Sequence, residues 1–483
     1  MEFIMSIFKA ISDLGSTLML PIMFTIIGLI FGCKFSKALK SGITVSIGMI
    51  GINLVMNLVY NNMEPIADVL VSDFGLSLKY LDVGWAAVSA VAFSTAVGAF
   101  IIPFILILNI ILISLKATRT MNIDIWNYWH YALTGSFIHM ATNNMILAFL
   151  GASLHFVASM VVADRTAKKV QEVMGIPGIS IPQGYAAATV PHSFLVDKVF
   201  DLFTKNRQEK EADSQKANKL RDNEIIKTIT DPIFVGLIIG TIIALIVGYD
   251  WKAALNVGIS MSALMYLLPR MAKVLMEALV PISNAARDFM TKMFKGQDIY
   301  IGMDSAVLLG HPTTITVGLV LMPITLLLAI FLPGNQLIPL AGISSMQWDV
   351  AMATVVHKGK FGRTLVSGII GTSMVLLISS YFGPYITEFA LSGAIAIPEG
   401  ATGISAMTVN LFTFIPNVIA NLDIIGGVAM VAGIVGLALW NRGWLKQQDQ
   451  LQTIISGMFN TFSRRVPFHA KRATSRNTLY FKC

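Results

Sequence analysis

The sequence predicts an all-α integral membrane protein of about 11 transmembrane helices plus two re-entrant segments, arranged as two inverted five-helix repeats. Three observations predict this fold. Hydrophobic residues make up 55% of the 483 residues and charged residues only 13%, whereas an average soluble domain is about one quarter charged. The mean hydropathy is +0.70. Three segments of the first half also recur, in the same order, in the second half.

Eleven apolar runs approach the length of about 20 residues that a membrane-spanning helix needs. The first run has no small-residue cleavage site behind it, so we interpret it as a retained span and not as a signal peptide. The predicted spans are 15–32, 41–60, 85–115, 125–141, 143–163, 231–249, 252–269, 313–333, 337–356, 364–382 and 424–440.

Charged residues between the spans predict the orientation of the chain. Lys and Arg cluster at 33–40, 115–120, 164–169, 205–227, 357–363 and 441–446. Acidic residues dominate 61–82 and recur at Asp250 and Glu388. Basic loops stay on the cytoplasmic side of a membrane, so we expect the N-terminus outside and the C-terminus in the cytoplasm.

Three segments do not fit the pattern of a simple span. Pro and Gly interrupt 175–200 and 385–412, and we expect both to re-enter the membrane where protein or a water-filled cavity covers their backbone. The basic, amphipathic stretch 270–296 is predicted to lie flat on the cytoplasmic membrane surface.

The two halves of the sequence resemble each other. "YLDVGWAAVSAVAFSTAVG" (80–98) aligns with "YIGMDSAVLLGHPTTITVG" (300–318), "ISIPQG" (179–184) with "IAIPEG" (395–400), and 21–32 more weakly with 232–240. Because the first repeat contains five spans, the second begins on the opposite side of the membrane. Inverted repeats are typical of transporters, which bind substrate near the membrane midplane between broken segments.

This duplication sets the predicted domain boundaries. They are a first repeat 1–204, a charged cytoplasmic linker 205–227, a second repeat 228–423, a final span 424–446 and a basic tail 447–483 without a predicted function. The tail has six Lys or Arg residues and one Asp and so carries much of the net charge of +8. The positive charge therefore does not indicate nucleic-acid binding. The two cysteines, Cys33 and Cys483, form neither a disulfide framework nor a metal motif, and no cofactor is expected.

Two carboxylates at the start of the repeats are candidate substrate-binding residues. Asp304 lies where the second repeat enters the membrane, and Asp82 lies near the corresponding point of the first. A carboxylate inside a membrane is costly and indicates function, although Asp304 could instead cap a helix that begins at Ser305. His311, next to Pro312, fits a site residue and a helix-end residue equally well.

Aromatic and polar residues extend this candidate site. Trp126 and His130 are four residues apart and share one helix face, which suits a ligand with C–H faces and hydroxyl groups. An interfacial aromatic belt would also explain Trp126 and Trp129. Trp85, close to Asp82, is either a site residue or an interfacial anchor.

The two Pro-Gly breaks contribute a matched polar pair. Gln183 and Glu399 occupy equivalent positions in "IPQG" and "IPEG". Their symmetry favours side chains that line a shared cavity. Alternatively, they satisfy backbone groups that the breaks leave unpaired.

Several longer motifs resemble one known family. They are "DVGWAAVSA", "DIWNYWHYALTG", "PGISIPQG", "LLPRMAKVLMEALVPIS", "YIGMDSAVLLGHP", "ITLLLAIFLPGN" and "AIPEG". These motifs resemble the galactitol-type enzyme IIC permeases of the bacterial phosphotransferase system, in the ascorbate–galactitol superfamily. The resemblance extends from about residue 10 to residue 446.

The resemblance implies a homodimeric, elevator-type permease of the inner membrane for galactitol or a similar polyol. It places Asp304, His130 and Gln183 at the substrate. Galactitol-type sequences often carry His at the position of Gln183, so the resemblance does not identify the polyol. It further implies that a IIB partner phosphorylates the sugar and that a IIA protein recharges IIB. The chain itself offers no soluble domain for this chemistry, because its longest hydrophilic stretch is about 205–227.

Two other functions remain open at this point. One is an ion-coupled secondary transporter for a sugar or an organic acid such as ascorbate, in which Asp304 and Glu399 would carry protons. The other is an intramembrane hydrolase that uses Asp304 with Asp82. The inverted repeats and the family motifs favour the permease over both alternatives.

Overall fold

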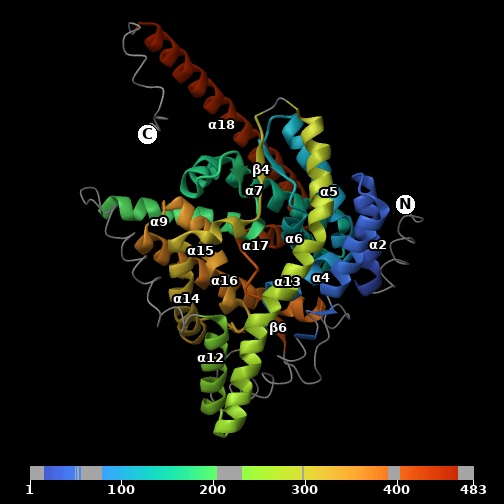
Figure 1. The fold of residues 1–483 in the computed structure, drawn as a ribbon, viewed down its shortest axis with the longest axis vertical. Helices are drawn as coiled ribbons and strands as arrows, with labels where there is room; N and C mark the ends of the chain where they lie inside the picture. The colour runs from blue at the N-terminus through green and yellow to red at the C-terminus, as the bar shows by residue number, and fades with distance from the viewer. Residues whose placement is uncertain are drawn as a thin grey trace.

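The computed structural model describes residues 16–48, 50–51, 54–55, 79–203, 231–295, 298–389 and 403–465, and these residues are mostly helical (Figure 1). Within them, five helices are long and apolar enough to cross a membrane. These helices are α5 (Ala96–Ser114), α7 (Met145–Met174), α14 (Pro312–Phe331), α16 (Phe361–Phe389) and the first part, Asp423–Leu451, of α18 (Asp423–Arg465). The fold is thus the all-α membrane fold that the composition predicts.

Further helices complete the two halves, and each predicted span overlaps a helix. In the first half these are α2 (Ser16–Ile30), a helix at 35–48, α4 (Gly84–Ser94), η1 (Ile125–Asn127), α6 (Tyr128–Thr142), α8 (Gly184–Ala188) and α9 (Val190–Phe203). In the second half they are α12 (Pro232–Ile246), α13 (Trp251–Met293), η2 (Ser305–Gly310), η3 (Gly342–Ser345), α15 (Met346–Val356) and α17 (Leu411–Ala420).

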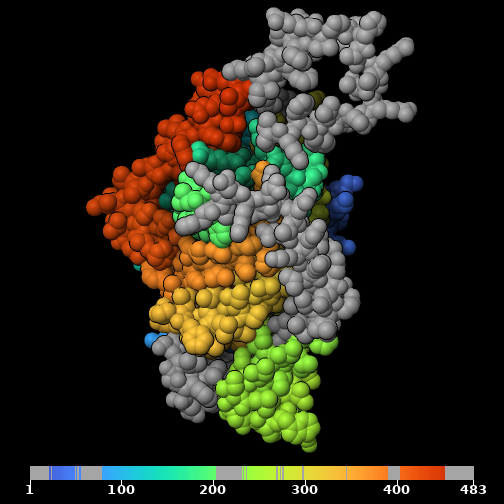
Figure 2. Space-filling model, turned by 90° about the vertical axis from the view of Figure 1, so that its left-hand side faces the viewer, coloured from blue at the N-terminus to red at the C-terminus, as the bar shows by residue number. Residues whose placement is uncertain are grey.

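Two of the predicted segments differ from the structure. The run 85–115 is not one helix, because it breaks at Thr95, whose hydroxyl accepts a hydrogen bond from the Gly98 N–H at 2.9 Å and begins α5. The stretch 270–296, predicted to lie on the cytoplasmic surface, is not separated from the preceding span. Most of this stretch continues α13 without interruption to Met293, and Figures 1 and 2 show α12 and the start of α13 projecting together from the rest of the molecule.

Six short strands, which the sequence did not predict, form two parallel sheets. One sheet has the order β5 (Leu337–Ile338), β1 (Tyr80–Asp82), β6 (Ile404–Ser405). The other has the order β2 (Thr120–Asn122), β4 (Tyr300–Gly302), β3 (Ile179–Ser180). All four strand pairs are parallel.

The two sheets exchange their central strands between the halves of the chain. β1, from the first half, lies between two strands of the second half, and Leu81 pairs with both Ile338 and Ile404. β4, from the second half, lies between two strands of the first half, and Ile301 pairs with both Met121 and Ile179. The sheets therefore fix the entrance of each half against the broken segments of the other.

A buried polar cluster holds α18 to the first half. The Asp164 carboxylate of α7 accepts hydrogen bonds from the hydroxyls of Thr118 and Thr120, at 2.8 Å each, and from Asn441 Nδ2 at 2.6 Å. Asn441 also donates to the Ala117 carbonyl at 2.9 Å. Buried charge is tolerated when its acceptors are filled in this way. α18 continues past this cluster into the predicted tail as far as Arg465.

Candidate functional site

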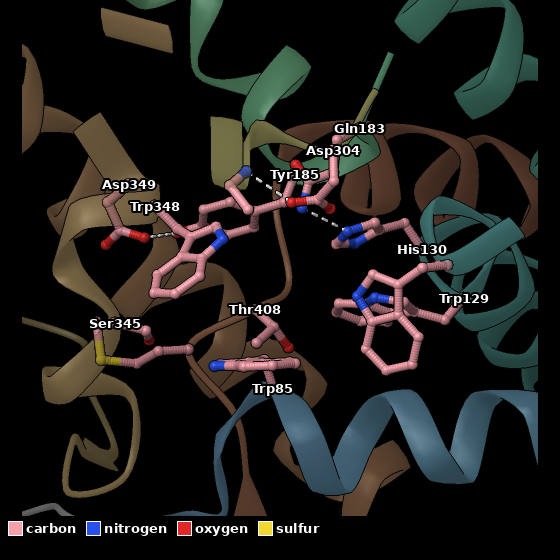
Figure 3. Close-up of a pocket in the computed structure, with 13 residues that line it drawn as sticks. Trp85, Trp129, His130, Gln183, Tyr185, Asp304, Ser345, Trp348, Asp349 and Thr408 are labelled. Atoms are coloured by element: carbon pink, nitrogen blue, oxygen red, sulfur yellow. Dashed lines mark hydrogen bonds between the residues drawn. The ribbon is translucent and has the colours of Figure 1, made fainter. Parts of the chain in front are cut away.

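The C-terminal ends of all six strands lead toward one small cavity, with about 50 Å³ of free space (Figure 3). Its walls come from the residues that immediately follow the strands. The lining residues are Trp85, Trp126, Trp129, His130, Gln183, Tyr185, Asp304, Ala306, Ser345, Trp348, Asp349, Met407 and Thr408.

The first broken segment places Gln183 against His130. Gln183 caps α8: its side-chain oxygen accepts the Ala186 N–H at 2.6 Å. The amide nitrogen therefore faces His130, and it lies 2.9 Å from His130 Nε2. Because this amide nitrogen is a donor, His130 Nε2 accepts and the ring proton resides on Nδ1. The buried pair thus presents a neutral imidazole to the cavity.

Asp304 lies at the corresponding entrance of the second half. Its Oδ1 caps η2 by accepting the Ala306 N–H at 2.7 Å, so the capping role considered from the sequence is present. The side chain also lines the cavity. No hydrogen bond from a described residue reaches its second oxygen, Oδ2. One carboxylate can thus cap the helix and still accept a hydrogen bond from a ligand.

A second carboxylate, Asp349, enters the wall from α15. Its Oδ1 accepts a 2.5 Å hydrogen bond from the Tyr185 hydroxyl of α8. Asp349 Oδ2 and the nearby Thr372 hydroxyl are both buried, and neither makes a hydrogen bond of ordinary geometry within the described residues. Thr408 Oγ1, also in the wall, is likewise buried without a partner in the part of the chain that the structure describes. Asp349 Oδ2 and Thr408 Oγ1 are thus both buried polar atoms of residues in the cavity wall.

Four tryptophans give the cavity its apolar surfaces. The Trp85 ring lies 6.2 Å from the Trp126 ring and 6.1 Å from the Trp348 ring, measured between centroids. Figure 3 shows Trp85 opposite Gln183, Asp304 and Tyr185. Trp126 and Trp129 are only 6% and 3% exposed, so the described structure encloses both, unlike residues of an interfacial belt. The combination of flat apolar rings with hydroxyl-binding groups suits a polyhydroxylated ligand.

The remaining predicted site residues lie elsewhere. Asp82 does not line this cavity; its carboxylate accepts the backbone N–H groups of Gly84 at 2.9 Å, Gly342 at 2.5 Å and Met407 at 3.1 Å. His311 caps α14 by accepting the Thr313 N–H at 3.2 Å, also outside the cavity wall. Glu399 lies outside the described residues. Contact of these three residues with a substrate remains a prediction.

Sequence reasoning missed several lining residues, and one of them carried a recognisable signal. Asp349 is a carboxylate inside the predicted span 337–356, so the argument that identified Asp304 applies to it equally. Trp129 was assigned to an aromatic belt, and Tyr185 and Thr408 had no distinguishing pattern. Among the described residues, no group of three or more His, Cys, Asp or Glu side chains could hold a metal ion.

Comparisons with known proteins point in one direction. The family model described as "PTS system sugar-specific permease component" (EIIC-GAT) matches residues 10–400. A protein of Escherichia coli K12 named "Putative permease IIC component" is 42% identical over 438 residues, which cover 90% of this chain and 98% of that protein. The "PTS system galactitol-specific EIIC component" of the same strain is 32% identical over 451 residues, or 92% of this chain and 98% of that protein. The corresponding O157:H7 protein matches equally.

Proposed function

Because this chain belongs to the family of PTS sugar-specific permease components, we propose that it carries galactitol or a similar hexitol across the inner membrane for phosphorylation by a IIB partner. The cavity supports this proposal most directly. It combines indole faces with the Asp304 carboxylate, the Gln183–His130 pair and the unpartnered Thr408 hydroxyl. A neutral hexitol can place its C–H faces against the indole rings and donate or accept hydrogen bonds with its hydroxyl groups at the polar side chains. The similarity to a galactitol-specific component supports the same class of substrate.

The proposal includes the inverted repeats and an elevator-type movement. The reciprocal exchange of β1 and β4 supports a twofold relation between the halves, because each central strand pairs with two strands of the other half. The sequence alignment independently pairs Tyr80 with Tyr300, which are the first residues of these two strands. In this proposal the repeats comprise 1–204 and 228–423, with the N-terminus outside and the C-terminus in the cytoplasm.

We place the phosphoryl-transfer chemistry on partner chains. Cys33 lies at the end of a membrane helix, where its Sγ is 3.5 Å from the Pro281 carbonyl, and not in a phosphate-binding loop. A IIB protein would transfer the phosphoryl group to the hexitol, and a IIA protein would recharge IIB. The homodimer implied by the family resemblance belongs to the same proposal. No observation of the cavity favours the ion-coupled transporter.

Transport by the purified, reconstituted full chain tests this function. Vesicles that contain only this chain should exchange labelled galactitol with unlabelled galactitol but should not accumulate it. Adding the cognate IIA and IIB proteins with a phosphoryl donor should convert external galactitol into internal galactitol phosphate. Accumulation of free galactitol driven by a proton or sodium gradient alone would contradict the proposal. A panel of polyols, sugars and ascorbate in the exchange assay would identify the substrate.

A further inference from the structure

A second hollow, separate from the substrate cavity, runs along the outside of α7. It measures about 420 Å³ and is bounded by α7, α9, α17 and α18. Apolar side chains form most of its wall, among them Leu154, Ala158, Val161, Phe194, Ile415 and Leu437. We call this hollow the α7 groove. In Figure 2, α18 is the red helix along one edge of the molecule.

The α7 groove has the length of one lipid chain. Both α7 and α18 are long and apolar enough to cross a membrane, so lipid surrounds their outer faces. Along α7 the wall extends from Leu154 to Arg165, which corresponds to a rise of about 16 Å at 1.5 Å per residue. One leaflet of a bilayer core is about 15 Å thick. An acyl chain that fills the groove would therefore place the lipid head group next to Arg165.

Arg165 gives the groove a charged end. Its guanidinium carbon lies 3.3 Å from the centroid of the Trp440 ring and 5.4 Å from that of Trp444. Its Nε and Nη2 atoms are buried, and no described residue makes a hydrogen bond to either. The adjacent carboxylate, Asp164, is already bound by Thr118, Thr120 and Asn441. Asp164 therefore attracts Arg165 through space but makes no hydrogen bond to it, and two N–H groups of Arg165 at the end of the groove have no described acceptor.

We propose that the α7 groove binds an anionic phospholipid, with one acyl chain along α7 and its phosphate at the Arg165 guanidinium. Arginine is well suited to phosphate because its planar N–H groups match the phosphate oxygens. Basic pockets between membrane helices are known to hold anionic head groups. Two further cations follow on α7: Lys168, which is exposed, and Lys169, whose Nζ lies 4.7 Å from the Phe194 ring.

One residue of the α7 groove packs against the first broken segment. His155 lines the groove, and its Nδ1 lies 2.7 Å from the Thr134 hydroxyl of α6. On its other side the His155 ring is so close to Gly184 that a side chain at Gly184 would begin 2.6 Å from His155 Nε2. Gly184 directly follows Gln183, the cap of α8. Lipid bound in the groove would therefore support the first broken segment from outside.

Native mass spectrometry of the detergent-solubilised full chain tests the lipid proposal without reference to transport. The chain is incubated with phosphatidylglycerol or with phosphatidylcholine of the same acyl chains. Wild type should retain phosphatidylglycerol preferentially. Arg165→Gln should weaken this retention on the order of fivefold, whereas Lys168→Gln, one turn along the same helix but outside the groove wall, should not. Ala158→Trp should fill the groove and remove the bound lipid.

Three outcomes would overturn the proposal. These are equal retention of the two lipids by wild type, unchanged retention by Arg165→Gln, and unchanged retention by Ala158→Trp. If Ala158→Trp dissociates an oligomer and leaves lipid retention unchanged, the groove belongs to a second copy of the chain instead. An unchanged unfolding temperature of Arg165→Gln in detergent shows that this variant is folded. Because neither lipid retention nor unfolding depends on galactitol, failure here is distinguishable from failure of the proposed transport function.

Discussion

The Tyr185 hydroxyl donates a 2.5 Å hydrogen bond to Oδ1 of Asp349 and so joins the first broken segment to α15 in the second half. Both side chains are buried and line the substrate cavity. The contact extends across the chain by 164 residues. A movement of α8 relative to α15 would therefore break this hydrogen bond unless both side chains moved together.

Tyr185→Phe should destabilise the protein more than Asp349→Asn. Removing the hydroxyl leaves a buried carboxylate without its donor, which costs about 1–3 kcal/mol. Asparagine at position 349 keeps an oxygen that can accept from Tyr185. Thermal unfolding of the detergent-solubilised protein measures both effects. The Tyr185→Phe/Asp349→Leu pair should restore part of the loss, because it removes both buried polar partners; strictly additive losses would mean that the bond is not formed.

Gln183 and His130 should act on substrate binding as a unit. Gln183→Leu removes both the cap of α8 and the donor to His130 Nε2, and we expect galactitol affinity to fall about tenfold, which corresponds to about 1.4 kcal/mol. Because the two residues share one contact, their losses should not add. The double variant Gln183→Leu/His130→Phe should bind galactitol almost as well as the single variant that has the lower affinity. Calorimetric titration of all three variants checks this. Independent, multiplying losses would contradict the pairing.

The sequence predicts the positions of the membrane helices, because the length of an apolar run indicates a span. Every predicted span overlaps a helix, and the turn between α6 and α7 forms where Asn143 adopts positive φ and Asn144 caps α7. The six strands could not be predicted, because each has only two or three residues and periodicity needs a longer window. Their partners are also distant: Tyr80 pairs with Leu337. The break at Thr95 has neither Gly nor Pro at the cap to mark it.

The part of the site that can be predicted from the sequence consists of charged residues within apolar runs. Asp304 was found because a carboxylate in an apolar run is costly, and the same rule would have found Asp349. The rule does not distinguish a ligand contact from a structural acceptor. Asp82 shows this: its sequence context resembles that of Asp304, but backbone N–H groups of Gly342 and Met407, more than 250 residues away, occupy its carboxylate.

Tryptophan at position 348 should contribute to binding through its apolar face. Trp348→Ala removes one wall of the cavity, and the lost contact area should weaken galactitol binding on the order of tenfold. Trp348→Phe retains a ring and should weaken it less. Trp251→Ala is the matched control, because Trp251 is 65% exposed at the start of α13 and lies outside the cavity wall. Calorimetry measures the affinities; equal effects of the 348 and 251 substitutions would contradict a role for Trp348.

The most discriminating comparison is between Asp304→Asn and Asp82→Asn. At position 304, the amide oxygen can still accept the Ala306 N–H and cap η2, so the fold should persist. The second oxygen becomes an NH₂ group and can no longer accept a substrate hydroxyl. Losing a hydrogen bond to a charged group costs roughly 1.5–3 kcal/mol, so affinity should fall on the order of 10- to 100-fold.

At position 82 the same exchange should act on stability. Oδ1 accepts from Gly84 and Met407 and Oδ2 accepts from Gly342, so an NH₂ group in either place would face an N–H donor. The sequence alone predicts that Asp82→Asn lowers binding and transport less than Asp304→Asn, because it places Asp82 nearer the outer surface. The structure buries the Asp82 side chain completely and predicts in addition a clear loss of thermal stability. Calorimetry and thermal unfolding on both variants should therefore separate them. If Asp304→Asn lowers the unfolding temperature as much as Asp82→Asn but binds galactitol like wild type, then Asp304 is a helix cap and does not contact the substrate.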